Sequence, residues 1–308
     1  MRSFITGVDG FIGSHLAEAL LAGGDEVSGL ARGASGTAGI VRFSGDIGNA
    51  QVVSDAIARA RPDRIFHLAA LNNIAASFAD PSTTIATNVV GTTHLLEAAR
   101  RHAPGAAFVS VGSSAEYGKT AETAAVLTEE LPLLPTSPYG VSKAAQGLLC
   151  RVYADVYRLR AMHVRPFAVI GPRKTKDAVS DFCRNVVALE RGETDRFIVG
   201  PLTSERDFID VRDAVAALVL LSERGAPGTA YNLCNATTAP LSAVVTILQG
   251  LSRKPFTPVA DPSRLRPADD RRIVGDASRL AALGYAPRFT LEDTLAATLA
   301  SWRARTAG

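Results

Sequence analysis

Three glycines near the start of the chain constrain its fold more than any other stretch of the sequence. Gly7, Gly10 and Gly13 follow the apolar run at residues 3–6 and precede residues 12–20, whose apolar positions recur at helical spacing. Glycine permits the tight turn and the close backbone approach by which a strand passes directly into a helix. The sequence therefore predicts that the chain opens with a strand, a glycine-rich turn and a helix.

Short apolar runs alternate with amphipathic helical patterns through the first half of the chain, which is typical of a parallel sheet covered by helices. We therefore expect an α/β fold, a Rossmann-type doubly wound parallel sheet with a smaller C-terminal lobe. The predicted strands are residues 3–6, 26–30, 41–43, 64–68, 107–111 and 162–167. The predicted domains are residues 1–170 with 205–235 for the sheet, and residues 171–204 with 236–308 for the lobe.

The overall composition favours a soluble cytoplasmic protein with a small-molecule ligand. A net charge of +3 over 308 residues, without a basic cluster, argues against nucleic acid as a partner. Cys150, Cys183 and Cys234 are widely spaced, which is typical of thiols in a reducing compartment and predicts neither a disulfide nor a metal site. Residues 1–6 leave no room for a signal peptide, and the aliphatic run 214–221 is too short to span a membrane.

The glycine-rich turn is also suited to a dinucleotide. Its backbone can approach a pyrophosphate, which is favoured at the positive end of the following helix. The spacing is GxxGxxG instead of the common GxGxxG. The motif is nevertheless informative, because it lies between the first predicted strand and the first predicted helix. We predict cofactor contacts at Gly7, Gly10, Phe11, Ile12 and Gly13.

The end of the second strand indicates which dinucleotide is bound. A site for NAD usually has an acidic residue there, whereas residues 27–32 contain no carboxylate and end with Arg32. A guanidinium suits a 2′-phosphate, so we expect NADP(H), with NAD(H) as the alternative; Arg32 is otherwise a solvated surface residue. Asp46 and Ile47 end the third strand, where we expect them to contact the adenine, although Asp46 is alternatively a helix N-cap.

Tyr139 and Lys143 stand four residues apart at the start of a predicted helix, which places them on one face of it. A lysine cation at ~4 Å and an intermediate dielectric is worth about 4 kcal/mol, which is enough to lower the pKa of a phenol towards neutral pH. The pair is therefore a candidate for proton transfer. By spacing alone a chance pair is the simpler interpretation, so the assignment depends on the surrounding motifs.

Those motifs resemble a known family. Residues 6–13, 67–70, 139–143 and 165–167 occur in the order seen in extended short-chain dehydrogenases/reductases that act on nucleotide sugars. The resemblance covers nearly the whole chain. Within the family, four further segments resemble GDP-6-deoxy-4-keto-mannose reductases and GDP-mannose 4,6-dehydratases, namely residues 180–182, 200–213, 265–269 and 275–276.

The resemblance implies roles for individual residues. Ser113 takes the place of the catalytic Ser/Thr, four residues before Tyr117, and Ser114 is the adjacent alternative and a predicted substrate contact. His67 and Asn88 are expected to support the site without reacting. Further cofactor contacts are implied at Leu68, Ala69, Ala70, Tyr139, Lys143 and Pro166.

The resemblance also implies a nucleotide-sugar substrate and a homodimer. Arg206 and Arg266 match arginines that bind the substrate diphosphate, and Asp269 matches an acidic ribose contact. Each is otherwise a surface charge, which is the commoner location of an arginine. The dimer would form through the helix that follows Tyr139, whose apolar residues suit either an interface or ordinary core packing: Leu148, Leu149, Val152 and Val156.

Two positions depart from the family. The 4,6-dehydratases carry a catalytic glutamate two residues after the Ser/Thr, where this chain has Ala115. Glu116 is adjacent, but on a strand-like segment it would point to the other face. Ala168 replaces an asparagine that contacts the substrate in relatives, which leaves the sugar and the nucleotide base open.

The leading hypothesis is NADPH-dependent reduction of the C4 ketone of a nucleotide-linked 4-keto-6-deoxy sugar, as in a GDP-4-keto-6-deoxymannose reductase. Tyr139 would protonate the developing alkoxide, Lys143 would hold its pKa down, and Ser113 would hold the same oxygen. The alternatives are a nucleotide-sugar 4-epimerase, a 4,6-dehydratase and a non-catalytic NADP-binding scaffold.

Overall fold

The computed structural model describes residues 1–33, 36–261 and 272–305. The chain divides into two compact units, one of residues 1–166, 215–233 and 277–285 and one of residues 167–214, 234–276 and 286–308. The predicted assignment of a cofactor domain and a substrate lobe stays a prediction. Within the described part of the chain, no helix is both long enough and apolar enough to cross a membrane.

A parallel sheet forms the centre of the first unit, and among the described residues it has seven strands in the order β11-β6-β5-β4-β1-β2-β3. The chain crosses from β3 over β1 and β2 to β4, which is the Rossmann arrangement and confirms the predicted fold class. The strands are β1 (Arg2–Thr6), β2 (Glu26–Ala31), β3 (Val41–Ser44), β4 (Arg64–His67), β5 (Ala107–Val111), β6 (Arg160–Pro166) and β11 (Ala230–Leu233).

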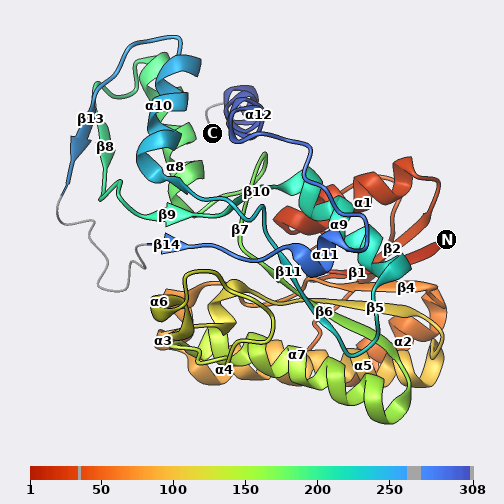
Figure 1. The fold of residues 1–308 in the computed structure, drawn as a ribbon. Coiled ribbons are helices and arrows are strands. Elements are labelled where there is room, and N and C mark those ends of the chain that lie inside the picture. Colours follow the sequence, from red (N-terminus) through yellow and green to blue (C-terminus); the bar gives the residue numbers. More distant parts are fainter. Residues whose placement is uncertain (34–35, 262–271, 306–308) are drawn as a thin grey trace. The chain divides into compact units, whose positions relative to one another are not determined.

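Helices cover both faces of this sheet (Figure 1). On one face lie α2 (Ala50–Ala60), α5 (Gly91–His102) and α7 (Pro138–Tyr157); on the other lie α1 (Phe11–Ala22) and α11 (Ser278–Ala281). The core between the sheet and the first three helices is fully buried at Phe4, Ile65, Leu95 and Phe108. Each such side chain contributes about 2 kcal/mol of hydrophobic stabilisation, so the sheet is a rigid base for the residues at its edge.

Local sequence explains where these helices begin. Pro138 occupies the first turn of α7, and the Ser137 hydroxyl accepts the Gly140 N–H at 3.1 Å. Asn49 caps α2 by accepting the N–H groups of Gln51 and Val52. The N-cap of α2 is therefore Asn49, not Asp46.

Short elements fill the connections around the carboxyl ends of β4 and β5. The first connection contains α3 (Ile74–Ala79), α4 (Pro81–Ile85) and the π-helix η1 (Ala86–Val90), which continues into α5. The second contains the 3₁₀-helix η2 (Ser114–Glu116) and α6 (Thr120–Thr123). A π-helix inserts an extra residue per turn and is frequent at functional sites, so its position here directs attention to Asn88.

The second unit combines helices with short strand pairs. Its core is built from apolar residues of α8, α10 and α12, among them Phe182, Val186, Leu248 and Leu295. The helices are α8 (Ala178–Arg191), α10 (Leu241–Leu251) and α12 (Leu291–Ala304), and α9 (Val211–Arg224) begins in this unit and continues into the first. The strands pair as β7 (Ala168–Ile170) with β10 (Phe208–Asp210), β8 (Phe197–Val199) with β13 (Pro258–Ala260), and β9 (Glu205–Arg206) with β12 (Ala239–Pro240) and β14 (Arg272–Ile273).

The register of the large sheet aligns the ends of its strands. Thr6 lies opposite His67, and His67 lies opposite Ser110 on β5. Because these strands are parallel, the segments that follow Thr6, His67 and Val111 leave the sheet along one edge. The glycine-rich turn, residues 68–70 and Ser113 are found on these segments.

Candidate active site

The glycine-rich turn has the geometry of a phosphate-binding loop. Gly7 has a left-handed φ of +71°, and a Cβ atom there would lie 2.9 Å from the Ala69 nitrogen. A Cβ atom on Gly13 would lie 2.2 Å from the carbonyl oxygen of Gly7. The N-cap of α1 is Gly10, which has no side chain to occupy the helix N-terminus. Residues 7–13 therefore fit a pyrophosphate, which needs backbone N–H groups and close approach.

The residues that follow β4 lie against this turn, as the cofactor prediction requires. Leu68 and Ala69 contact Gly7, and together with Ala70 they are half-buried. The Ala69 N–H donates to the Thr6 hydroxyl at 3.2 Å. Pro166 is half-buried at the carboxyl end of β6, beside Leu233 of β11.

Arg32 and Asp46 come together at the ends of β2 and β3. The Arg32 Nη1 lies 3.8 Å from the Asp46 Oδ2, and both side chains are exposed. The Asp46 Oδ1 also accepts the Gly48 N–H at 2.8 Å, which closes a turn. Ile47 is 5 % exposed and packs into the core. Of these residues, Arg32 presents its charge to solvent.

A second arginine at this edge was missed by the sequence analysis. Arg42 of β3 forms an ion pair with Asp9 of the glycine-rich turn, although 33 residues separate them. The ion pair depends on the register in which Arg42 lies opposite Gly29 of β2. No local motif at residue 42 signals this contact.

His67 is a buried structural residue. Its Nδ1 bonds to the Thr6 hydroxyl and its Nε2 to the Thr92 hydroxyl, both at 2.8 Å. Burial lowers the pKa of His67 to about 3, and the charge of Lys143 adds to this effect. The imidazole is therefore neutral at physiological pH and joins β1, β4 and α5.

Asn88, in the π-helix, supports the site through the backbone. Its amide oxygen accepts the Leu71 N–H at 2.8 Å, and its nitrogen donates to the Leu71 carbonyl and to the Ser142 hydroxyl. Ser142 in turn donates to the carbonyl of Tyr139 at 2.7 Å. Asn88 thus links the loop after β4 to the first turn of α7.

Tyr139 and Lys143 are both buried on one face of α7. The tyrosine is 8 % exposed and the lysine 3 %. The Lys143 Nζ donates to the carbonyl oxygen of Val111 at 2.8 Å and lies 5.9 Å from the centre of the Tyr139 ring. Because Val111 ends β5, this hydrogen bond places the pair beside Ser113, two residues further along the chain.

The expected lowering of the tyrosine pKa is wrong for this arrangement. Burial raises the pKa of Tyr139 to about 12, although a hydrogen bond with the Ser113 side chain opposes this, and the negative charge of Glu116 raises it further. Burial also lowers the pKa of Lys143 to about 8, against the charge of Glu116. The ammonium group donates its hydrogen bond to the main-chain carbonyl of Val111. At neutral pH the phenol is therefore protonated.

Ser113 presents its hydroxyl from a turn, not from a strand. The residue caps the 3₁₀-helix η2, and its oxygen accepts the Ala115 N–H at 3.1 Å. A hydroxyl that accepts one hydrogen bond still has a proton to donate. Ser114 and Ala115 are half-buried on the same turn. The expectation of a strand-like segment here is therefore incorrect.

The Glu116 carboxylate is nevertheless engaged by two side chains of β6. It is fully buried, and its two oxygens contact the Nε2 of His163 at 2.8 Å and the Nε of Arg165 at 2.9 Å. The residue at the dehydratase position is Ala115, which has no titratable group. The turn therefore holds a hydroxyl donor and no available carboxylate.

In the second unit, Arg206 lies on β9 and is half-buried. Its Nη1 donates to the carbonyl of Glu205 at 2.9 Å. The adjacent Asp207 is buried and accepts the N–H groups of Asn235 and Gly275. Burial raises the pKa of Asp207 to about 6. Arg266 and Asp269, the other predicted substrate contacts, lie outside the described residues.

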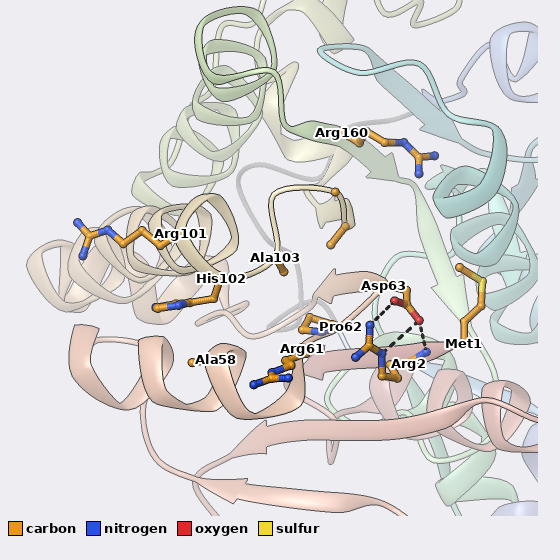
Figure 2. A pocket seen from close by; sticks show the side chains of 12 residues that line it. Met1, Arg2, Ala58, Arg61, Pro62, Asp63, Arg101, His102, Ala103 and Arg160 are labelled. Carbon is orange, nitrogen blue, oxygen red and sulfur yellow. Dashed lines mark hydrogen bonds and ion pairs between the residues drawn. The ribbon is translucent and has the colours of Figure 1, made fainter.

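A hollow of about 890 Å³ opens at the opposite edge of the first unit's sheet, where the strands begin (Figure 2). Its lining includes Arg2 and Arg160, the first residues of β1 and β6. The Arg2 guanidinium binds Asp63, and Figure 2 shows Arg101 and Arg160 directed away from one another. The basic side chains do not converge, and the hollow is separate from the residues at the carboxyl ends of the strands.

Comparison with known proteins gives a consistent result over nearly the whole chain. The family model described as GDP-mannose 4,6 dehydratase matches residues 4–298. The GDP-6-deoxy-D-mannose reductase of Pseudomonas aeruginosa is 31% identical, over 99% of this chain and 98% of the reductase. The UDP-glucose 4-epimerase of Mycolicibacterium smegmatis is also 31% identical, over 98% of this chain and 99% of the epimerase.

Solved structures also match this chain over nearly its whole length. RMD from Pseudomonas aeruginosa, complexed with NADPH, has a TM-score of 0.86 and 29% identity, covering 99% of this chain and 100% of that one. The UDP-glucose 4-epimerase of Thermotoga maritima, with UDP-glucose, has a TM-score of 0.89 and 26% identity, covering 98% and 99%.

Proposed function

The chain belongs to the GDP-mannose 4,6-dehydratase family, and on that premise we propose that it reduces the C4 ketone of a nucleotide-linked 4-keto-6-deoxy sugar with NADPH. The observation that carries this proposal is the turn at residues 113–116. It combines the Ser113 hydroxyl, close to Tyr139, with Ala115 where a dehydratase has its base. Such a site can protonate an alkoxide but lacks the carboxylate that eliminates water.

NADPH is the proposed cofactor, and NADH is the alternative. The glycine-rich turn with its uncapped helix N-terminus fits the pyrophosphate, and Arg32 is a solvent-facing guanidinium for a 2′-phosphate. The similar Pseudomonas aeruginosa structure holds NADPH. When bound, the reduced nicotinamide would supply the hydride for the carbonyl carbon.

The chain's own residues would supply the proton. The buried phenol of Tyr139 is protonated at neutral pH, as a proton donor must be. Ser113 would donate a hydrogen bond to the same carbonyl oxygen and hold it near the phenol. Lys143 keeps a positive charge beside the ring, which stabilises the phenolate that proton donation leaves behind. The ketone thus gains one hydride and one proton and becomes an alcohol, while NADPH becomes NADP⁺.

The proposed substrate contacts are the residues that the family resemblance implies, namely Ser114, Arg206, Arg266 and Asp269. A guanidinium can bind a diphosphate with two parallel hydrogen bonds, which is the physical reason for assigning the two arginines. Ala168 lies on β7, where an asparagine would have offered an amide. The nucleotide base and the sugar are therefore left to experiment.

A 4-epimerase is the second candidate, because a UDP-glucose 4-epimerase is 31% identical over 98% of the chain. An epimerase returns the hydride to the same sugar and consumes no NADPH. A reductase consumes one NADPH for each sugar. The proposal is tested by mixing the purified protein with NADPH and GDP-4-keto-6-deoxymannose and following NADPH absorbance. Stoichiometric loss that disappears in Tyr139→Phe supports reduction. Absence of loss, together with inversion at C4 of UDP-glucose supplied in a parallel assay, supports the epimerase.

The proposal includes a cytoplasmic homodimer. Four apolar side chains of α7 are 46–65 % exposed and lie on one face at helical spacing: Val141, Leu148, Val152 and Val156. A row of exposed apolar residues beside polar surface is typical of an interface. Leu149, by contrast, packs against the core of the first unit.

A further inference from the structure

The turn that carries Ser113 contains one fully buried carboxylate, Glu116. Its Oε1 accepts the main-chain N–H of Ser113 at 2.9 Å, while the Ser113 hydroxyl accepts the Ala115 N–H. Ser113 and Glu116 therefore form a capping box, in which the side chain of each residue accepts a main-chain N–H of the turn. A change in the Glu116 side chain would move the main chain of Ser113 directly.

Glu116 is fixed from the adjacent strand. The Nε2 of His163 and the Nε of Arg165, both on β6, contact its two oxygens at 2.8 and 2.9 Å. Burial raises the pKa of Glu116, but the charges of His163 and Arg165 and the hydrogen bonds outweigh burial, so its pKa lies below the usual value. The carboxylate is therefore a stable anion, and its position is set by the sheet.

Two glycines make room for the Glu116–His163 pair. A Cβ atom on Gly112 would lie 2.2 Å from the Glu116 Oε1 and 2.3 Å from the His163 Nε2. A Cβ atom on Gly147 would lie 2.8 Å from the His163 Cδ2. Gly147 is one helical turn after Lys143 on the same face of α7. The pair therefore fills the space between the end of β5, which leads to Ser113, and the helix face that carries Lys143.

The charge of Glu116 also acts on α7. Lys143 is 3 % exposed, and burial disfavours its ammonium form, whereas the negative charge of Glu116 favours it. The same charge disfavours ionisation of Tyr139. The other titratable groups that interact with Glu116 or Lys143 are His67 on β4, His163 and Arg165 on β6, and Cys150 on α7.

We propose that Glu116 is a positioning residue for the reaction: it fixes the main chain of Ser113 and supplies the negative charge that keeps Lys143 an ammonium ion beside Tyr139. This role rests on the proposed reduction, in which Ser113 and Tyr139 act on the ketone oxygen. It differs from the role of the dehydratase glutamate, since Glu116 neither faces the substrate nor exchanges its proton.

Two conservative variants separate the two parts of this role. Glu116→Gln keeps the size of the side chain but removes its charge, so the alkaline limb of the kcat profile should move to lower pH. Glu116→Asp keeps the charge but is too short to reach both Ser113 and β6. We therefore expect kcat to fall about 10²-fold, while the alkaline limb of its pH profile stays at the wild-type pH. In both variants we expect little change in the KM for NADPH.

Asp25→Asn is the control, because the side chain of Asp25 is only 7 % exposed and is paired with a buried arginine, Arg64, but at the amino end of the sheet. It should lower thermal stability and leave kcat and its pH profile as in the wild type. If the Glu116 variants also lose only stability, Glu116 is structural and the inference is wrong. The same conclusion follows if kcat falls equally in both variants and the alkaline limb of Glu116→Gln does not move.

A measurement without substrate separates this inference from the proposed function. The chain has five lysines, so the side-chain NMR signal of Lys143 can be assigned with Lys143→Arg and titrated in the apoprotein. The pKa of Lys143 should be lower in Glu116→Gln than in the wild type. An equal pKa overturns the charge role even if the enzyme reduces ketones, and a lowered pKa supports it even if the enzyme proves to be an epimerase.

Discussion

The ammonium nitrogen of Lys143 donates to the carbonyl oxygen of Val111 at 2.8 Å, and this hydrogen bond joins α7 to the carboxyl end of β5. The strand end continues into the turn that carries Ser113, while the helix carries Tyr139 one turn before the lysine. This contact therefore brings the helix face with Tyr139 and Lys143 to the strand end that leads to Ser113. Their arrangement does not require a mobile loop.

Burial of Lys143 should make the wild type less stable than a variant without that charge. The folded pKa of about 8 lies below the unfolded value near 10.5, so below pH 8 the folded state must hold a buried ammonium ion. Between these values the unfolded state binds more protons, and stability contributed by this group rises with pH. Lys143→Met should be about 1–2 kcal/mol more stable at pH 7, with a gain that shrinks towards pH 10.5.

Thermal unfolding of both proteins from pH 7 to 10 measures this difference, and the variant should lose nearly all activity. A Lys143→Met protein that is less stable than the wild type at pH 7 would show that the hydrogen bond to Val111 outweighs the burial of the charge.

Arg32 should determine the preference for NADPH. Arg32→Ala removes the exposed guanidinium at the end of β2, so the KM for NADPH should rise about tenfold or more, while the KM for NADH stays nearly constant. Steady-state kinetics with each cofactor measures the ratio. Arg61→Ala, in the hollow at the opposite edge, is the control and should change neither value. An equal rise for both cofactors would mean that Arg32 does not read the 2′-phosphate.

The contribution of Asp207 to the free energy of unfolding of the second unit should decrease as the pH rises from about 4 to about 6. Its pKa is raised from 3.8 to about 6, so between these values the folded state binds more protons than the unfolded state. Stability contributed by this group is therefore present below pH 4 and lost by pH 6. Asp207→Asn cannot ionise, and its stability relative to the wild type should improve between pH 4 and pH 6.

Urea unfolding at several pH values, with a probe in the second unit, tests this trend. A difference between variant and wild type that is constant with pH would show that folding does not raise the pKa of Asp207.

The exposed apolar face of α7 should hold the dimer together. Leu148→Glu places a charge on a side chain that is 62 % exposed, so it should cost the monomer little and disrupt an apolar interface. Light scattering after size exclusion should show a dimer for the wild type and a monomer for the variant. Leu134→Glu is the control, since Leu134 is 51 % exposed but does not belong to α7. A wild type that is already monomeric would refute the interface.

Much of the fold follows from local patterns. The six predicted strands are present as β1 to β6, because apolar runs between helical stripes are local signals. The strand β11 was not predicted. It has only four residues, Ala230–Leu233, and is identified as a strand by its pairing with β6, which precedes it by more than sixty residues.

The sequence nominated the candidate site residues, whose roles stay predictions, but it did not predict their protonation chemistry. Spacing placed Tyr139 and Lys143 on one helix face, but the direction of the tyrosine pKa depends on burial, which tertiary packing decides. Likewise, the side chain of Glu116 points inward because it contacts His163 and Arg165 on β6. The alternation of side chains along a strand does not explain this direction. The Asp9–Arg42 ion pair is long-range in the same way.

Transfer of label from NADPH tests the central claim most directly. The protein is incubated with GDP-4-keto-6-deoxymannose and NADPH that carries deuterium at both hydrogen positions of the nicotinamide C4, and the sugar product is examined by mass spectrometry and NMR. A reductase predicts one deuterium at C4 of the 6-deoxy sugar for each NADPH consumed, and none with Tyr139→Phe. No loss of NADPH and no deuterium in the sugar, together with inversion at C4 of UDP-glucose in a parallel incubation, would contradict the reductase and identify an epimerase.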